Sequence, residues 1–308
     1  MKNILYLAGL LFLSTAVLTS CEENDPEIIP GSTTVIADHS IAYEDILRAI
    51  PEEYINAARD GLHVAYQHTS HGTHVSRGMF GLPDYKAGDD TRFAITNNNP
   101  QDDKLDFRDN AMASYAESGV DASDLSRNET AFIQATRNYL DDPDNSEINV
   151  IMWSWCNIEG HDVEANYLPG MQTLISEYPS VAFIFMTGHA NQNDNLGDGK
   201  PKNQADLIIN YCKENKYYCL DYYGIDTHDM DGNYWEDAGD DGNSSTGGNF
   251  YTDWQDSHSV GDGYFENKTS PGGSVAYGAH NSQHITANRK AYAMWYILAT
   301  IAGWEGGN

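Results

Sequence analysis

Positively charged residues are scarce in this chain. It contains 17 Lys and Arg residues against 46 Asp and Glu residues, so its formal net charge at pH 7 is −29. A surface of this sign repels the phosphates of nucleic acids and anionic lipid head groups, so we expect neither as a partner. The charge suits a protein that works outside the cytoplasm, but it does not reveal the fold.

Cysteine is also rare, with four residues in 308. Cys212 and Cys219 are close enough in sequence to pair across a helix-to-strand turn. Cys156 would then be the odd one, and an odd cysteine in an exported chain is more typical of a buried, inert thiol than of a reactive one. Cys21 lies three residues after the last residue of a long apolar run.

That apolar run lies behind Lys2 and covers residues 4–18, ILYLAGLLFLSTAVL. Its length is typical of a signal peptide rather than of a membrane-spanning helix. The run ends in LTSC at 18–21, which resembles the bacterial lipobox, and this resemblance implies cleavage before Cys21 and diacylglycerol on its sulfur. We therefore expect residues 1–20 to be a lipoprotein signal peptide and the mature chain to be lipid-anchored to the outer membrane in the cell envelope.

The residues that follow Cys21 are acidic. Residues 22–27, EENDPE, contain no apolar side chain, and we interpret residues 21–40 as a solvated tether. Similar runs resemble the surface-export signal of Bacteroidetes lipoproteins, which would imply surface exposure, while a plain flexible linker is the alternative. Residues 41–308 are long enough to bury a substantial core, and we expect them to form a single domain.

Apolar runs typical of buried strands alternate with helical patterns along this region. The runs lie at 62–66, 148–153, 181–186 and 217–222, and the helical patterns at 130–140, 164–178, 203–214 and 286–302. Continuous apolar strands that alternate with helices predict a parallel sheet covered on both faces. We therefore expect an α/β fold, a three-layer α/β/α sandwich with a mainly parallel, flavodoxin-like sheet. Pro169 must kink or delay the second helix.

Two stretches break this alternation. Residues 78–128 are polar with scattered apolar side chains, and no strand can be placed there from the pattern. Residues 224–280 are rich in Gly, Asp, Asn and Ser, and a loop of that length inside a compact domain is usually functional or partly disordered. We interpret it as an excursion over the top of the sheet.

Polar side chains follow the expected strands. They lie in four segments, which are 67–74, 153–157, 187–191 and 280–284. Ligands of open parallel sheets bind beyond the carboxyl ends of the strands, so these segments should meet at one rim. We expect substrate contacts there from His68, His71, Trp155, His189 and Asn191.

The order of these segments resembles that of the SGNH, or GDSL-type, hydrolases over roughly residues 60–302. In that family a Ser follows the first strand, an Asn after a middle strand donates to the oxyanion, and a His before the last helix is the base, with an Asp three residues earlier. The resemblance implies that Ser70 is the nucleophile, Asn157 the oxyanion donor and His284 the base, with Asn281 in the place of the Asp. The implied activity is that of a serine esterase that removes acyl groups from carbohydrate.

The chain departs from the family pattern at several positions. His68-Thr69-Ser70 replaces Gly-Asp-Ser, and Asn157 is not followed by an acid. A Ser hydroxyl needs a neighbouring imidazole to take its proton, and that imidazole needs a partner to fix its tautomer and stabilise its charge. Asn281 can do the first and does the second poorly. An Asp of the 224–280 segment, such as Asp253 or Asp256, is an alternative partner.

No cofactor is expected, because neither metal pattern is complete. The histidines at 68, 71 and 74, which His161, His189 and His284 could approach, suggest zinc, but no carboxylate or Cys stands at ligand spacing in that motif. The acidic run at 226–233 suggests calcium, but it places Thr227 first and Ala238 twelfth in an EF-hand frame, so we interpret it as an acidic turn.

Two other functions remain open. A polysaccharide lyase or dehydratase would use the same histidines and a Tyr as general base and acid on an acidic sugar, without Ser70. A non-catalytic glycan-binding lipoprotein would use the many aromatic residues, which include 20 Tyr and 6 Trp. In each case the expected partner is a carbohydrate or a small ester, and the expected membrane contact is the lipid anchor alone.

Overall fold

The apolar runs form the centre of a six-stranded parallel sheet in the computed structural model, which describes residues 34–306 apart from the side chain of Asn281. The expected signal peptide and Cys21 lie outside the described residues. The strands are β1 (Val35–Ala37), β2 (His63–Gln67), β3 (Asp106–Asp109), β4 (Val150–Trp153), β5 (Ala182–Met186) and β6 (Tyr218–Leu220). Their order across the sheet is β1-β6-β5-β4-β2-β3, and every neighbouring pair is parallel.

This order confirms the predicted fold class. Strands β3-β2-β4-β5-β6 follow the flavodoxin-like arrangement, and β1 extends the sheet beside β6. Two strands correct the interpretation of the sequence. The tether expected over residues 21–40 is too long, since Val35–Ala37 pairs with β6, and β3 lies within the stretch in which no strand could be placed.

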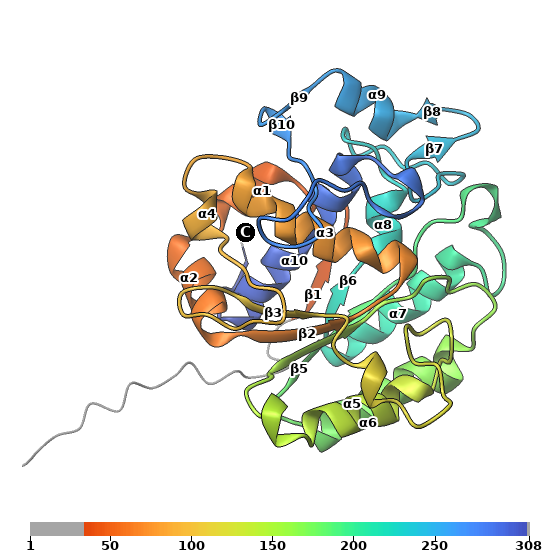
Figure 1. Cartoon of the computed structure of the whole chain (residues 1–308). Helices are drawn as coiled ribbons and strands as arrows, with labels where there is room; N and C mark the ends of the chain where they lie inside the picture. The colour runs from red at the N-terminus through yellow and green to blue at the C-terminus, as the bar shows by residue number, and fades with distance from the viewer. Residues whose placement is uncertain (1–33, 307–308) are drawn as a thin grey trace, which may run out of the picture.

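Helices cover both faces of the sheet (Figure 1). One face carries α1 (Glu44–Ala49), α2 (Glu52–Gly61), α3 (Thr73–Gly81) and α10 (His284–Ile301), and the other carries α5 (Ala131–Leu140), α6 (Leu168–Glu177) and α7 (Pro201–Asn215). Successive strand residues point to opposite faces, so Val64 joins the first core and Ala65 the second. Both faces of the sheet are therefore buried, which explains the unbroken apolar runs.

Two helices show how local sequence sets the fold. Pro169 lies in the first turn of α6, where its missing N–H costs nothing, and a π-helical turn at Val163–Tyr167 precedes it. Helix α10 is buried on nearly all sides, because it packs against α1, α2 and α3 as well as near β1 and β6. No helix within residues 34–306 is both long enough and apolar enough to cross a membrane.

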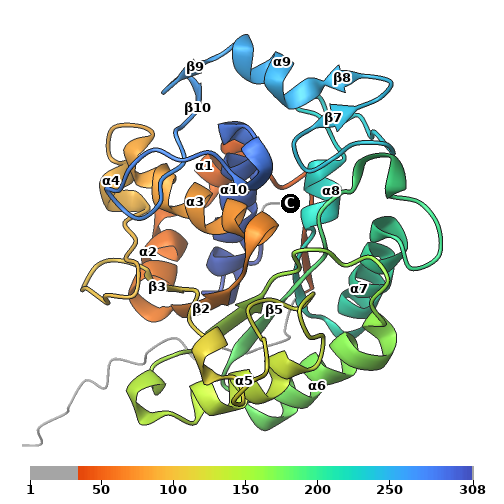
Figure 2. The ribbon, with the colours of Figure 1, turned by 45° about the vertical axis from the view of Figure 1, so that its right-hand side comes forward.

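The excursion after β6 has its own short elements. They are α8 (Tyr222–Asp226), β7 (Asn243–Ser244), β8 (Gly248–Asn249), α9 (Phe250–Asp256), β9 (Ser259–Val260) and β10 (Gly263–Tyr264), and a short α4 (Asp89–Arg92) lies elsewhere, before β3. Figure 2 shows α9 and β7–β10 above α8 and the start of α10. The acidic turn is closed by Asp229, whose carboxylate accepts hydrogen bonds from the backbone of Asp231 and Asn233.

The cysteines do not form the bridge that their spacing permits. Cys212 on α7 and Cys219 on β6 are buried free thiols, and Cys156 is a partly buried one. Burial raises the pKa of the Cys219 thiol well above its ordinary value, with a hydrogen bond to Cys212 adding to the shift. These two residues therefore belong to the core between the sheet and α7.

Candidate functional site

The polar segments meet where β2 and β4 end, which is the switch point of the sheet topology. Directly after β2, the chain runs through His68 and Thr69 into a 3₁₀ turn, η1 (Ser70–Gly72). Two carboxylates hold this exit, because Asp109 Oδ1 lies 2.7 Å from His68 Nε2 and Asp124 accepts a hydrogen bond from the Thr69 hydroxyl. The turn therefore starts from a fixed point.

Ser70 has a left-handed backbone, with a φ of +42°. Such a conformation is uncommon for a residue with a side chain, and it is often found at functional sites. Gly72 permits the tight turn, since a Cβ there would stand 2.4 Å from Ser154 Oγ. Ser70 thus stands partly exposed in a tight turn just beyond the end of β2.

A histidine from the far end of the chain meets this hydroxyl. His280 Nε2 lies 2.6 Å from Ser70 Oγ. His280 belongs to the 3₁₀ turn η7 (Ala279–Asn281), and it also has a left-handed backbone, with a φ of +56°. The distance is that of a hydrogen bond, so the two residues have the contact of a nucleophile and its general base.

Three imidazoles are stacked beside Ser70. The ring centroid of His71 lies 3.6 Å from that of His189 and 4.2 Å from that of His280. Burial, together with the two neighbouring imidazoles, lowers the pKa of His71 to about 2. Burial lowers the pKa of His189 to about 4. Both rings are therefore neutral at pH 7.

The excursion brings Asp240 into this cluster. Asp240 Oδ2 lies 3.4 Å from His71 Nε2, although the two atoms are not aligned as a hydrogen bond and this oxygen has no hydrogen-bond partner among the described residues. Asp240 is only 9% exposed. Burial, reinforced by the charge of Asp226, raises its pKa to about 8.

Two asparagines that follow β5 dock the segment that carries Asp240. Asn191 forms an antiparallel bridge with Gly239. The buried amide of Asn195 donates to the carbonyl oxygens of Glu236 and Ala238 at 2.9 and 2.8 Å. The position of Asp240 is therefore set by contacts to the same strand end that carries His189.

A buried ion pair lies beneath the cluster. Lys290 Nζ is 2.6 Å from Asp226 Oδ1, and both side chains are fully buried. The other oxygen of Asp226 accepts a hydrogen bond from the backbone of Ala190, next to His189. The Tyr222 hydroxyl lies 2.7 Å from the carbonyl oxygen of His71 and 2.6 Å from His74 Nδ1. This network fixes the backbone on which His71 and His189 stand.

The expected base, His284, has a different role in the structure. Its Nδ1 accepts a hydrogen bond from the backbone N–H of Asn267 at 3.2 Å, and its ring stacks on Tyr277 with centroids 4.6 Å apart. The imidazole that reaches Ser70 is His280, four residues earlier. Asp253 and Asp256, the proposed carboxylate partners, are exposed on α9, and the side chain of Asn281 lies outside the description.

The remaining expected residues divide into two groups. His71 and His189 lie beside Ser70, and Asn191 reaches Glu159 as well as Gly239. Trp155 is fully buried in the core, and His68 is 4% exposed and paired with Asp109, so the substrate contacts expected of both are corrected.

Asn157 is exposed at the rim. Its side-chain oxygen accepts a hydrogen bond from the backbone of Glu159, and its own backbone N–H donates to Ser126. These contacts leave the Asn157 amide nitrogen as the group that could donate to an oxyanion.

Two residues of the cluster were missed from the sequence. His280 lies in the segment 280–284, which was expected at the rim. Within that segment, only the spacing of the SGNH family pattern favoured His284 over His280. Asp240 is one of many acids in the excursion, and nothing in the sequence distinguishes it from its neighbours. Its place depends on the docking by Asn191 and Asn195, which is a tertiary contact.

Comparison of the chain with protein-family models, with curated proteins and with solved structures found no match. The functional argument therefore depends on the residues of the site and their geometry.

Proposed function

We propose that this protein is a serine esterase with an SGNH-like arrangement, in which Ser70 is the nucleophile and His280 the general base. The observation that carries this proposal is the 2.6 Å contact between Ser70 Oγ and His280 Nε2. The contact lies at the carboxyl end of β2, where open parallel sheets bind their ligands. A hydroxyl in this contact can lose its proton to the imidazole as it attacks.

The reaction has two halves. Ser70 Oγ attacks the ester carbonyl carbon while its proton passes to His280 Nε2, and the imidazolium then protonates the departing alcohol oxygen. A water molecule, deprotonated by the same imidazole, then attacks the acyl-enzyme carbonyl carbon, and the imidazolium returns the proton to Ser70 Oγ as the acid is released. Each tetrahedral intermediate needs hydrogen-bond donors for its oxyanion, and the Asn157 amide is a candidate donor.

The proposed substrate is an acyl group on a carbohydrate. Tyr277 lies three residues before His280 and is 57% exposed, and Tyr234 on the excursion is 44% exposed. Exposed aromatic rings offer apolar faces on which a sugar can stack. We place this activity in the cell envelope, with the chain anchored through lipid on Cys21. A C21A protein that still fractionates with membranes would contradict the anchor.

The elimination alternative receives less support from the geometry. Tyr222, whose hydroxyl lies 2.7 Å from the carbonyl oxygen of His71, is fully buried. A general acid must reach its substrate, so a buried hydroxyl is poorly placed for that role.

The test is acetate release from acetylated glycans and from model esters. The S70A protein should lose activity by at least about 1,000-fold, since members of a nucleophile and base unit act together. Full activity in S70A would overturn the assignment of the nucleophile. No release by the wild type from any ester, together with binding of the glycans, would favour the non-catalytic alternative.

A further inference from the structure

A buried carboxylate oxygen without a hydrogen-bond partner requires an explanation. Asp240 Oδ2 is such an atom among the described residues, and it lies 3.4 Å from His71 Nε2. Keeping this group ionised without a partner costs several kcal/mol, by an order-of-magnitude reckoning, and that cost is what raises its pKa. A cation held between these groups would supply the missing partner.

The three side chains have the spacing of metal ligands. One ligand atom each from His71, His189 and Asp240 lies within 4.8 Å of the other two. A zinc ion binds nitrogen and oxygen at about 2.0–2.1 Å, so its tetrahedral ligand atoms stand about 3.3 Å apart. The 3.4 Å between His71 Nε2 and Asp240 Oδ2 matches one edge of that tetrahedron.

The ring proton of His189 is placed as in metal-binding histidines. The rings of His71 and His189 are stacked within 14° of parallel, so they would tilt on binding to bring both lone pairs to one ion. His189 Nδ1 lies 2.7 Å from the carbonyl oxygen of Ala190, so this nitrogen carries the ring proton and Nε2 keeps a free lone pair. Metal-binding histidines almost always donate their other N–H in this way. His71 directs Nδ1 towards Cys156 Sγ, at 3.9 Å, which leaves its Nε2 on the side of Asp240.

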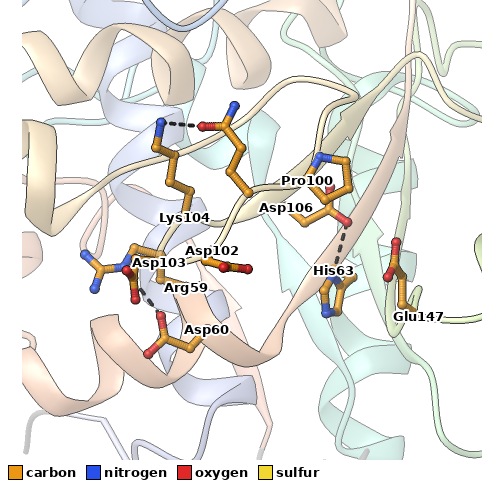
Figure 3. Close-up of a pocket in the computed structure, with 10 residues that line it drawn as sticks. Arg59, Asp60, His63, Pro100, Asp102, Asp103, Lys104, Asp106 and Glu147 are labelled. Carbon is orange, nitrogen blue, oxygen red and sulfur yellow. Dashed lines mark hydrogen bonds and ion pairs between the residues drawn. The ribbon is translucent and has the colours of Figure 1, made fainter.

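A second grouping in the molecule lacks these features. One ligand atom each from His63, Asp106 and Glu147 also lies within 4.8 Å of the other two. These residues are at the amino ends of β2 and β3 and just before β4, and they line a cavity of about 390 Å³ (Figure 3). There Arg108 hydrogen-bonds both Asp106 and Glu147, and His63 Nδ1 is 3.0 Å from Asp106. These carboxylates already have a cation, so this grouping serves as a control.

We propose that His71, His189 and Asp240 bind one divalent transition-metal ion of the zinc class, beside Ser70. Two imidazoles and one carboxylate leave a tetrahedral ion one open position, as in catalytic zinc sites. The ring of His280 stacks on His71, so a proposed ligand adjoins the histidine that contacts Ser70. The inference goes beyond esterase chemistry and does not depend on it.

The experiment measures metal binding directly. The purified, chelator-treated protein is titrated with Zn²⁺ against a chromophoric chelator, and Co²⁺ is added separately to record its visible absorption. We expect one equivalent of Zn²⁺ per chain and the intense absorption of tetrahedral Co²⁺. Removing a residue that only hydrogen-bonds a metal ligand typically lowers metal affinity by about 10- to 100-fold. D240N and H189N remove ligands themselves, so each should lower the affinity for Zn²⁺ by more than about 100-fold.

Matched variants make the result decisive. E147Q, in the control grouping, should bind Zn²⁺ like the wild type, and S70A should also bind it while losing esterase activity. Absence of Zn²⁺ uptake by the wild type would overturn the inference whether or not the variants fold. Loss of uptake in E147Q with retention in D240N would do the same. Metal binding without esterase activity would instead contradict the proposed function alone.

Discussion

Ser70 and His280 are 210 residues apart in the chain, yet the hydroxyl oxygen and ring nitrogen of the pair lie 2.6 Å apart. Both residues have a left-handed backbone, so two uncommon conformations meet at one contact. Strain of this kind costs on the order of 1–3 kcal/mol per residue and persists where the surrounding structure over-determines it. The pair is therefore the point from which the chemistry should be tested.

The first prediction separates His280 from His284. H280N should lose esterase activity as severely as S70A, and the S70A/H280N protein should be no worse than either, since the two residues form one unit. H284N should keep kcat within about 10-fold, because His284 contacts Asn267 and Tyr277 rather than Ser70. Acetate release from a model ester measures each variant, and an inactive but folded H284N would return the role of base to His284.

The second prediction concerns the exposed Tyr277. Its ring stacks on His284 and offers its other face to solvent. Y277A should raise KM for an acetylated glycan by up to about 10-fold, on the order of the 0.5–1.5 kcal/mol expected for a stacked aromatic contact. KM for a small model ester should change little, and Y234A supplies the comparison at the other exposed ring. Equal losses on both esters would contradict a sugar-stacking role.

The sequence revealed the middle of the fold better than its edges. Strands β4 and β5 are buried on both faces, so their apolar runs identify them, whereas β3 is an edge strand whose residues Asp106 and Arg108 pair with one another. Strand β1 has three residues and follows an acidic segment. Short or polar edge strands carry little periodicity, and only pairing in the sheet reveals them.

The site was located better than it was resolved. The rule that ligands bind beyond strand ends brought Ser70, His71 and His189 together correctly. The choice between His280 and His284 depends on the positive φ of His280, which redirects its side chain and which no local pattern indicates. Asp240 lies on a loop that is held at the site by hydrogen bonds to Asn191 and Asn195. These are tertiary contacts, so the sequence pattern alone does not distinguish Asp240 from the other acids of the loop.

The third prediction tests that docking. N195A removes a buried side-chain amide that accepts a hydrogen bond from the Asn191 backbone N–H and donates to the carbonyl oxygens of Glu236 and Ala238. Each buried backbone group left without a partner costs about 1–3 kcal/mol of stability. We expect faster limited proteolysis within residues 228–248 and weaker Zn²⁺ binding, because Asp240 loses its fixed position. The exposed Asn99, which lies before β3 and outside this segment, is the control, and N99A should be cut at the wild-type rate. Unchanged cleavage of N195A would show that the segment is held by other contacts.

The fourth prediction concerns the buried pair of Lys290 and Asp226. K290M leaves a fully buried carboxylate without its cation, which should lower the free energy of unfolding by about 3–5 kcal/mol. K290M/D226N should recover most of this loss, because a neutral amide oxygen can still accept the hydrogen bond from Ala190. Urea unfolding of the wild type and both variants measures the difference. A double variant as unstable as K290M would assign the loss to packing instead of charge.

The fifth prediction is a pH dependence of stability that arises at His228. Its ring stacks on His39 with centroids 3.4 Å apart, and its Nδ1 lies 2.7 Å from the carbonyl oxygen of Gly224. Burial, with smaller effects of His39 and Arg289, lowers the pKa of His228 to about 4, and burial also lowers that of His39. The folded protein therefore keeps the His228 ring neutral at a pH where the unfolded chain protonates it.

The sign follows from proton linkage. Below about pH 6.5 the unfolded state binds a proton at His228 that the folded state binds only near pH 4, so this residue lowers the free energy of unfolding as the pH falls. Since the ring is partly exposed, we expect an effect on the order of 1 kcal/mol between pH 7 and pH 5. H228N keeps a donor for Gly224 but has no titrating ring, and its stability relative to the wild type should therefore improve by that amount over the same interval. Urea unfolding at the two pH values isolates this term, because the buried aspartates titrate equally in both proteins. A relative stability that is independent of pH would show that His228 titrates alike in the folded and unfolded states.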